Sequence, residues 1–489
     1  MRRLAPSLAS AGAAVLLVAC AVGPDYQRPT APVPAAYKEA PSVAGATWLP
    51  AAPADALDRG DWWRLFGDDE LNRLAADVDS ANQTVAGAVA SYRQAQSLVR
   101  EARAAYFPTV GLSVGASRSG AGSTRRSLSG TSSSGTSFSA GLGADWAPDF
   151  WGRVGRAVEG ARASEQATAA DLAAARLSAQ GEMAIDYFAL READFEAELL
   201  MRTIDGYERA LVITQNRYAA GIVPKTDVLQ AETQLETTRS SLSTVRANRE
   251  RFEHAIAVLV GKAPGDFSLA ARPWNAVVPA IPVGVPSALL QRRPDIAATE
   301  RQIATANAQI GIERAAYFPN LTLSASLGNA GSRIGDLFKV SNAVWSVGVA
   351  LAQTVFDAGA IGARVSAAEA SRDVAVARYR HTVLAAFQGV EDQLSNARSQ
   401  AEQAALLKEA SDAADQTEQQ ILNRYRAGQL SYTEVVTAQA SALSARRALV
   451  QMAVNRQVTA ITLIQALGGG WDAAAPVELN GSARSDNAR

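Results

Sequence analysis

One turn pattern occurs twice in the chain, about two hundred residues apart: NRYAAG at Asn216–Gly221 and NRYRAG at Asn423–Gly428. Each copy ends a long stretch of helical period with a Gly, the residue that most easily adopts the left-handed conformation of a helix C-cap. Another helical stretch opens within a few residues, so each pattern predicts the tip of a helical hairpin. A helix–helix turn without function is the alternative. The predicted tip residues are Arg217, Tyr218, Gly221, Arg424, Tyr425 and Gly428.

Other motifs recur at a similar offset, which indicates a tandem duplication. Tyr106-Phe107-Pro108 returns as Tyr317-Phe318-Pro319, and AVLVG at Ala257–Gly261 parallels QALGG at Gln465–Gly469. We therefore predict a first repeat at 61–262, a Pro-rich equatorial connector at 263–293, a second repeat at 294–470 and a C-terminal tail at 471–489. Each repeat is expected to contain a helix, a strand pair and a long helical hairpin.

The N-terminus predicts the compartment. A basic start and an apolar stretch precede Leu17-Val18-Ala19-Cys20, which matches the lipobox of a bacterial lipoprotein. Residues 1–19 are then a signal peptide, and Cys20, the single cysteine of the chain, carries S-diacylglycerol and N-acyl groups. The absence of an Asp at Ala21 favours the outer membrane. A cleaved signal with an incidental cysteine is the alternative. Residues 20–60 are predicted to form a Pro- and Ala-rich tether between lipid and body.

Composition argues against several classes of function. The net charge of −1 and the 19% of charged residues disfavour a nucleic-acid partner. The two histidines, His254 and His381, lie far apart and without metal-ligand spacing. Nucleotide-binding, hydrolase and zinc-protease motifs do not occur. We expect no catalytic residues, no metal and no cofactor other than the lipid on Cys20, and therefore no enzymatic activity.

Four segments alternate with period two instead of the helical period. Apolar residues occupy every second position in 110–116, 138–146, 321–327 and 345–351, and small or polar residues lie between them. A strand of about ten residues spans a bilayer, and this alternation suits one lipid face and one wet face. We expect the Ser- and Gly-rich loops 118–136 and 328–343 to face the cell exterior. A half-buried soluble hairpin would show the same alternation.

Four strands cannot close a barrel, and an open sheet edge in lipid leaves backbone groups without partners. The protein is therefore expected to oligomerise, and the sequence alone allows eight, twelve or sixteen strands in total.

The remaining segments are predicted helices, approximately 71–106, 152–217, 226–261, 294–317, 361–424 and 434–467. Their abundant Ala allows close helix packing. A coiled-coil stalk without a lumen is the alternative. The aromatic residues of the segment from Asp61 to Leu71 are interpreted as core packing.

Several motifs of the chain resemble those of a known protein family. They comprise VGPDY at Val22–Tyr26, DWWRLF at Asp61–Phe66, QRRPDI at Gln291–Ile296, both Tyr-Phe-Pro sites, both Arg-Tyr-x-x-Gly tips and ALGGGW at Ala466–Trp471. Together they resemble the NodT branch of the TolC-like outer-membrane factors over nearly the whole mature chain. The resemblance implies a mainly α fold with membrane β-strands. In it, a homotrimer forms a twelve-stranded barrel on an α-helical barrel.

The same resemblance implies a function and a set of partners. The trimer would be the exit duct of a tripartite multidrug efflux pump in the outer membrane of a Gram-negative bacterium, reaching far into the periplasm. An inner-membrane transporter of the RND type and a periplasmic adaptor protein would complete the pump, and outer-membrane lipid would surround the strands.

In that family, rings of acidic and polar side chains after the tips close the duct. The matching positions here are Thr226, Asp227, Thr433, Glu434 and Thr437. The sequence departs from the family at Thr437, where Asp is common, and at Leu430, where some members have Arg, so the second ring is expected to carry less charge. Asp227 and Glu434 could instead cap their helices.

Two other functions remain open. One is an exit duct of a secretion system for polypeptides or oligosaccharides, and the other is a lipid-anchored coiled-coil structural protein.

Overall fold

The computed structural model describes residues 22–39, 59–120, 135–274, 276–279, 281 and 292–469. The signal peptide, Cys20 and the C-terminal tail lie outside these ranges, as do parts of the tether, the first strand loop and the connector. The chain forms two compact units. Unit 1 comprises 1–30, 92–167 and 299–379, and unit 2 comprises 31–91, 168–298 and 380–489. Each unit takes segments from both predicted repeats, so the repeats divide the sequence but not the packing.

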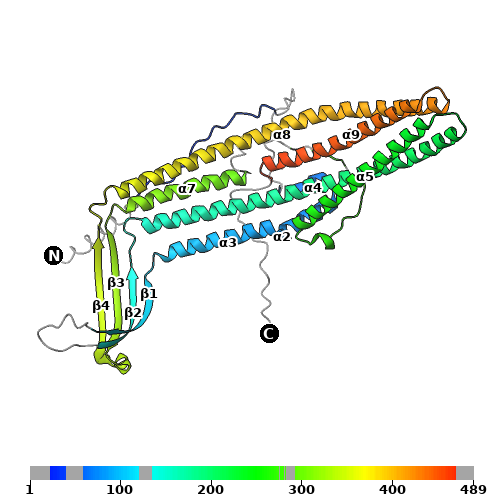
Figure 1. Ribbon diagram of the computed structural model, residues 1–489. Coiled ribbons are helices and arrows are strands. Elements are labelled where there is room, and N and C mark those ends of the chain that lie inside the picture. Colours follow the sequence, from blue (N-terminus) through cyan, green and yellow to red (C-terminus); the bar gives the residue numbers. More distant parts are fainter. Residues whose placement is uncertain are drawn as a thin grey trace. The chain divides into compact units, whose positions relative to one another are not determined.

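Unit 1 contains a four-stranded antiparallel sheet with the strand order β1-β2-β3-β4 (Figure 1). The strands are β1 (Thr109–Ser119), β2 (Gly135–Trp146), β3 (Asn320–Gly331) and β4 (Ala343–Ala352). All four predicted strands are present, and each repeat supplies one hairpin. In the single chain, β1 and β4 are the two edge strands.

The register gathers the alternating apolar residues on one face of the sheet. Leu112 pairs with Leu142, Leu142 with Leu327, and Leu327 with Trp345. The residues between them are mostly Gly and Ser, and they form the other face. The apolar face lies open: Leu112 and Val347 are each 74% exposed. Fully exposed apolar faces of this size are unfavourable in water, so this face requires a covering phase or partner.

The second strand loop is shorter than the predicted loop over 328–343. Strand β3 continues to Gly331, and two short 3₁₀ helices follow, η4 (Ile334–Phe338) and η5 (Val340–Asn342). The extension arises because Asn329 and Gly331 remain paired with β2.

The helices occur in two sets of equal length. Helices α3 (Gln83–Ala104) and α7 (Pro294–Ala315) have 22 residues each. Helices α4 (Arg153–Ala219) and α8 (Ala360–Arg426) have 67 residues each, and α5 (Lys225–Leu259) and α9 (Tyr432–Ala466) have 35 each. These matches confirm the predicted duplication. No helix in the described ranges is both long and apolar enough to span a membrane.

The prediction of one helix over 71–106 is wrong. Helix α2 (Asp69–Ala81) ends at Asn82 and α3 begins directly after it. The Asn82 side chain accepts hydrogen bonds from the backbone N–H groups of Thr84 and Val85, at 2.9 and 3.1 Å, and donates one to the Leu259 carbonyl at 2.8 Å. A distant carbonyl and a local N-cap together stabilise a break that helix propensity does not reveal.

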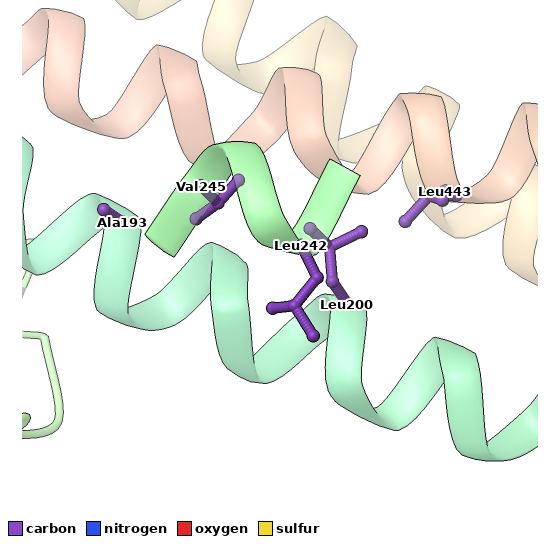
Figure 2. Packing of buried hydrophobic residues seen from close by; sticks show 5 residues of the cluster. All are labelled: Ala193, Leu200, Leu242, Val245 and Leu443. Atoms are coloured by element: carbon purple, nitrogen blue, oxygen red, sulfur yellow. The ribbon is translucent and has the colours of Figure 1, made fainter. Parts of the chain in front are cut away.

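The core of unit 2 forms where α4, α5 and α9 pack together. Figure 2 shows one cluster, made by Ala193, Leu200, Leu242, Val245 and Leu443. A second cluster surrounds Trp62, Trp63 and Phe66 of η2 (Arg59–Phe66), which are 2–4% exposed. The ring of Phe66 lies 5.0 Å from that of Phe188 on α4. The aromatic segment after Asp61 therefore packs in a core, as interpreted from the sequence.

The described part of the predicted tether, residues 22–39, is extended but bound to the protein. In unit 1, Val22 N–H donates to the Trp151 carbonyl at 3.1 Å, and the Tyr26 hydroxyl donates to Glu300 at 3.0 Å. In unit 2, the backbone N–H groups of Lys38 and Glu39 donate to the Glu391 carboxylate. These contacts fix the segment along the helices, so this part is not a free linker.

Candidate functional site

Both predicted hairpin tips are present in unit 2, and both end in the same hydrogen-bond pattern. Gly221 and Gly428 each have φ +74°. Gly221 N–H donates to Tyr218 O and Ile222 N–H to Arg217 O; the second tip repeats both bonds. This is the Schellman arrangement, which satisfies carbonyls that a helix end leaves unpaired. A non-glycine residue would be strained at either φ. The two turns connect α4 to α5 and α8 to α9 (Figure 1).

The two tips contact each other asymmetrically. The Arg217 guanidinium lies 4.6 Å from the centre of the Tyr425 ring, and its Nη1 donates to the Tyr425 carbonyl at 3.3 Å. The side chain of its repeat counterpart Arg424 makes no hydrogen bond, ion pair or ring contact with the part of the chain that the structure describes. Likewise Tyr425 is buried, whereas Tyr218 is 46% exposed. One Arg–Tyr pair therefore links the two hairpins.

Tyr432, which the sequence analysis did not select, packs against the Tyr425 ring of this contact. It is the first residue of α9 and is 2% exposed, and its ring lies 5.4 Å from that of Tyr425 in an edge-to-face arrangement. Burial raises the pKa of Tyr432 to about 12, with Tyr425, Tyr207 and Asp227 adding to the shift, so the phenol stays neutral. One sequence signal could have identified Tyr432: it is an aromatic residue at the start of α9, and the equivalent position of the first repeat holds Lys225.

Four of the predicted gate residues, Thr226, Asp227, Thr433 and Glu434, lie in the first turns of α5 and α9, and Thr437 lies in the second turn of α9. The Thr433 hydroxyl donates to the Gln230 amide oxygen at 3.2 Å, which joins the two helix starts. The Thr437 hydroxyl donates back to the Thr433 carbonyl at 2.9 Å. Within the described residues, the carboxylates of Asp227 and Glu434 accept no hydrogen bond, and the N-caps Pro224 and Ser431 form no side-chain cap. Side-chain capping therefore does not account for these two acids, and their role as gate residues stays a prediction.

A groove of about 690 Å³ lies between α4 and the α8–α9 hairpin, close to the tips. Leu199, Ile213 and Leu422 line it, with Arg202, Arg209, Arg426 and Arg446 among the residues around them. Two side-chain atoms in its lining, Tyr425 Oη and Gln439 Oε1, are buried and have no hydrogen-bond partner. Such atoms are unfavourable unless a partner or water satisfies them.

The described residues contain no group of three or more His, Cys, Asp or Glu side chains placed to hold a metal ion.

Comparisons with known proteins agree with this architecture. A family model described as outer membrane efflux protein matches residues 74–262 and again residues 285–469. The two matched segments correspond closely to the two predicted repeats.

Relatives are similar over nearly the whole chain. The pyoverdine export outer membrane protein OpmQ of Pseudomonas aeruginosa is 32% identical over 457 residues, which cover 90% of this chain and 92% of the relative. The cation efflux system protein CusC of Escherichia coli is 28% identical over 460 residues, with coverage of 94% and 98%.

Among solved structures, the outer-membrane channel OprN matches with a TM-score of 0.82 at 30% identity, covering 92% of this chain and all of that one. A CusC structure matches with a TM-score of 0.78 at 27% identity and the same coverage.

Proposed function

Because the chain belongs to the outer membrane efflux protein family, we propose that it is the exit duct of a tripartite multidrug efflux system. It is an outer-membrane export channel with a TolC-like fold. The family consists of channels and not of enzymes. A coiled-coil structural role does not fit the four-stranded sheet. The observation that carries the proposal is this sheet, with one exposed apolar face and two unpaired edges.

We propose that the functional unit of the protein is a homotrimer. Strands β1 and β4 run in opposite directions, so β4 of one copy can pair antiparallel with β1 of the next. Three copies close a twelve-stranded barrel, and closure removes the open edges that lipid does not tolerate. The apolar face then contacts outer-membrane lipid, and the Gly- and Ser-rich face lines the lumen.

The proposal also includes the lipid on Cys20 and the pump partners. Val22, two residues after Cys20, is hydrogen-bonded to Trp151 between β2 and α4, which supports an anchor close to the end of the sheet. An inner-membrane RND transporter would supply substrates. A periplasmic adaptor would bind the groove near the tips, because its apolar lining and unsatisfied polar atoms suit an amphipathic helix.

The names of the relatives mention pyoverdine, cations and toluene, so the substrate class needs a broad test. We would delete the gene and measure growth inhibition by antibiotics, an organic solvent and metal cations. The proposal predicts increased susceptibility to several unrelated compounds and restoration by the wild-type gene. Unchanged susceptibility throughout, with loss of an exported polypeptide or oligosaccharide, would instead support the secretion duct.

Two variants in the same strain test the groove. Ile213→Asp places a charge in the groove, whereas Val212→Asp places one on the neighbouring, non-lining residue, which is 55% exposed. We expect Ile213→Asp to abolish resistance although the trimer still forms, and Val212→Asp to retain resistance. Full resistance with Ile213→Asp would exclude the groove as the adaptor site.

A further inference from the structure

The turn between β3 and β4, residues 332–342, folds back onto the apolar face of the sheet. Asn329 lies two residues beyond Leu327 and therefore on the same face. Its Nδ2 donates to the Leu337 carbonyl of the turn at 2.6 Å. Gly331 lies on this face too, and a Cβ there would collide with the Asp336 side chain. A glycine at this position thus allows the turn to approach the strand.

The turn covers the middle of the sheet and not its edges. Helix η4 contacts β3 and β2. Phe138 of β2, which is in register with Gly331, is half-buried, although Leu112 on β1 and Trp345 on β4 lie open on the same face. The turn therefore leaves both edge strands available for pairing with other copies.

The turn is folded, yet its outer surface is apolar. Asp336 accepts hydrogen bonds from Arg333 N–H at 3.1 Å and from the Lys339 ammonium at 2.9 Å, and Asn342 donates to the Asp336 carbonyl. These bonds stabilise the turn internally. Nevertheless Ile334, Phe338 and Val340 are 61%, 84% and 90% exposed. Large apolar side chains on a well-ordered turn indicate a contact with another apolar phase.

The cationic residues Arg118, Arg333 and Lys339 lie at the same end of the sheet as this apolar surface. Lys339 is paired with Asp336. In contrast, the Arg333 side chain forms no salt bridge within the described chain, although its charge helps to lower the pKa of the Asp336 carboxyl after Lys339 and the backbone. Arg118, on β1, shares the face of Leu112 and Val114 and likewise has no ion-pair partner in the described ranges. Apolar side chains next to unpaired cations are typical of a surface that meets an anionic lipid headgroup layer.

The position along the strands fits a membrane boundary. Trp146 ends β2 on the side of the helices, and Phe138 lies next to the turn. The eight steps from Phe138 to Trp146 span roughly 27 Å along the strand at about 3.4 Å per residue. At the tilt of about 40° that membrane strands have, this is roughly 21 Å of height, against about 25 Å for the apolar band, which aromatic girdles flank on both sides. The turn thus lies near the boundary of the apolar band opposite to Trp146.

We propose that the turn 332–342 is an anchor for the outer leaflet of the outer membrane. Phe338 and Val340 enter the acyl-chain boundary, while Arg333 and Arg118 bind the phosphate groups of the lipid headgroups. The inference rests on the proposed function only in placing the sheet in the outer membrane with this turn outside.

The first experiment measures whether the turn enters lipid. A cysteine replaces Val340 in a Cys20→Ser background, is labelled with an environment-sensitive dye, and the protein is reconstituted into vesicles. Ser117→Cys, at the same end but on the polar face, is the control. We expect a blue-shifted emission at Val340→Cys that brominated acyl chains quench, and unquenched emission at Ser117→Cys. Water-like emission at both positions would contradict the anchor.

The second experiment measures the phosphate contacts. Wild-type protein and the double variant Arg118→Gln with Arg333→Gln are reconstituted into vesicles that contain a diphosphorylated glucosamine-based lipid or its dephosphorylated form. The quantity measured is the amount of that lipid that each protein retains. Each cation near an anionic surface contributes about fivefold, so we expect roughly 30-fold weaker retention of the phosphorylated lipid by the variant. The control pair Arg93→Gln with Arg251→Gln, on helix surfaces, should bind as the wild type does. Equal retention by all proteins would overturn the proposed phosphate contacts.

Channel recordings on the same samples separate this inference from the proposed function. A variant that loses lipid retention while conducting normally supports the anchor. Wild-type protein that conducts but shows no preference for phosphorylated lipid refutes the anchor and leaves the channel intact.

Discussion

At the scale of single residues, the two copies of one turn have acquired different contacts. Arg217 contacts the Tyr425 ring and carbonyl of the other hairpin, and Arg424, its counterpart, has no such contact within the described chain. The sequence motifs of the two tips are nearly identical and cannot reveal this asymmetry. It depends on which tip directs its arginine toward the tyrosine of the other. Arg217, Tyr425 and Tyr432 therefore form a direct link between the two hairpins, beside the hydrogen bond from Thr433 to Gln230.

Replacing Arg217 by Ala should loosen the tips. A cation–π contact at an exposed site contributes about 0.5–1 kcal/mol, and three copies of it would act together in the proposed trimer. Spin labels at Ile222→Cys, in a Cys20→Ser background, report the distances between tips by double electron–electron resonance. We expect longer and broader distances with Arg217→Ala and unchanged ones with Arg424→Ala. Equal distributions for both variants would show that the Arg217–Tyr425 contact does not hold the tips.

At the scale of elements, α4 carries half-buried carboxylates without cations of their own. Burial raises the pKa of Glu192 to about 7, with Glu196 adding to the shift, and raises that of Asp186 to about 6, with Glu182 adding. Arg447, whose charge partly offsets the raised pKa of Glu192, is bound to Glu196. The folded state therefore binds these protons more tightly than the unfolded state does.

This shift predicts a pH dependence of stability. Because the pKa of Glu192 is higher in the folded state, the contribution of Glu192 to the free energy of unfolding is fully present below its ordinary pKa of about 4.5. That contribution is lost as the pH rises through about 7. Allowing for solvent screening, Glu192 accounts for roughly 1 kcal/mol. The Tm of the wild type should fall between pH 5 and pH 8, and Glu192→Gln should reduce that fall by about 2 °C. Glu250→Gln, an exposed acid on α5, should not.

An identical fall in Tm for the wild type and Glu192→Gln would show that Glu192 does not cause the pH dependence.

Local patterns predicted most elements well. Period-two alternation gave all four strands, because a sheet with one apolar face fixes every second residue. The tip glycines followed from the backbone conformation that they require. The break at Asn82 was missed, because the Leu259 carbonyl that stabilises it lies far away in the sequence. The bound segment 22–39 was missed for the same reason: Tyr26 and Lys38 meet carboxylates of distant helices.

At the scale of the whole molecule, the single chain is incomplete in lipid. Two sheet edges lie unpaired and the apolar face is open, so the strands require further copies of the chain and a bilayer. The duplication makes the sheet of one chain continuous, because each repeat contributes one hairpin to it. The proposed trimer would pair the remaining edges, and it would place Asp227 and Glu434 of three copies near one axis.

Recording of single channels in planar bilayers tests this account most directly. The purified wild-type protein should insert as a trimer and conduct in small steps, with a preference for cations. Asp227→Ala combined with Glu434→Ala should raise the step size and weaken the cation preference while the trimer remains intact. Like charges repel, so this outcome requires the acids to hold the closed state through donors such as Thr226, Thr433 or Thr437, or through a bound cation. An intact trimer that shows no conductance, in the wild type and in the double variant alike, would contradict the claim that this chain forms an export channel.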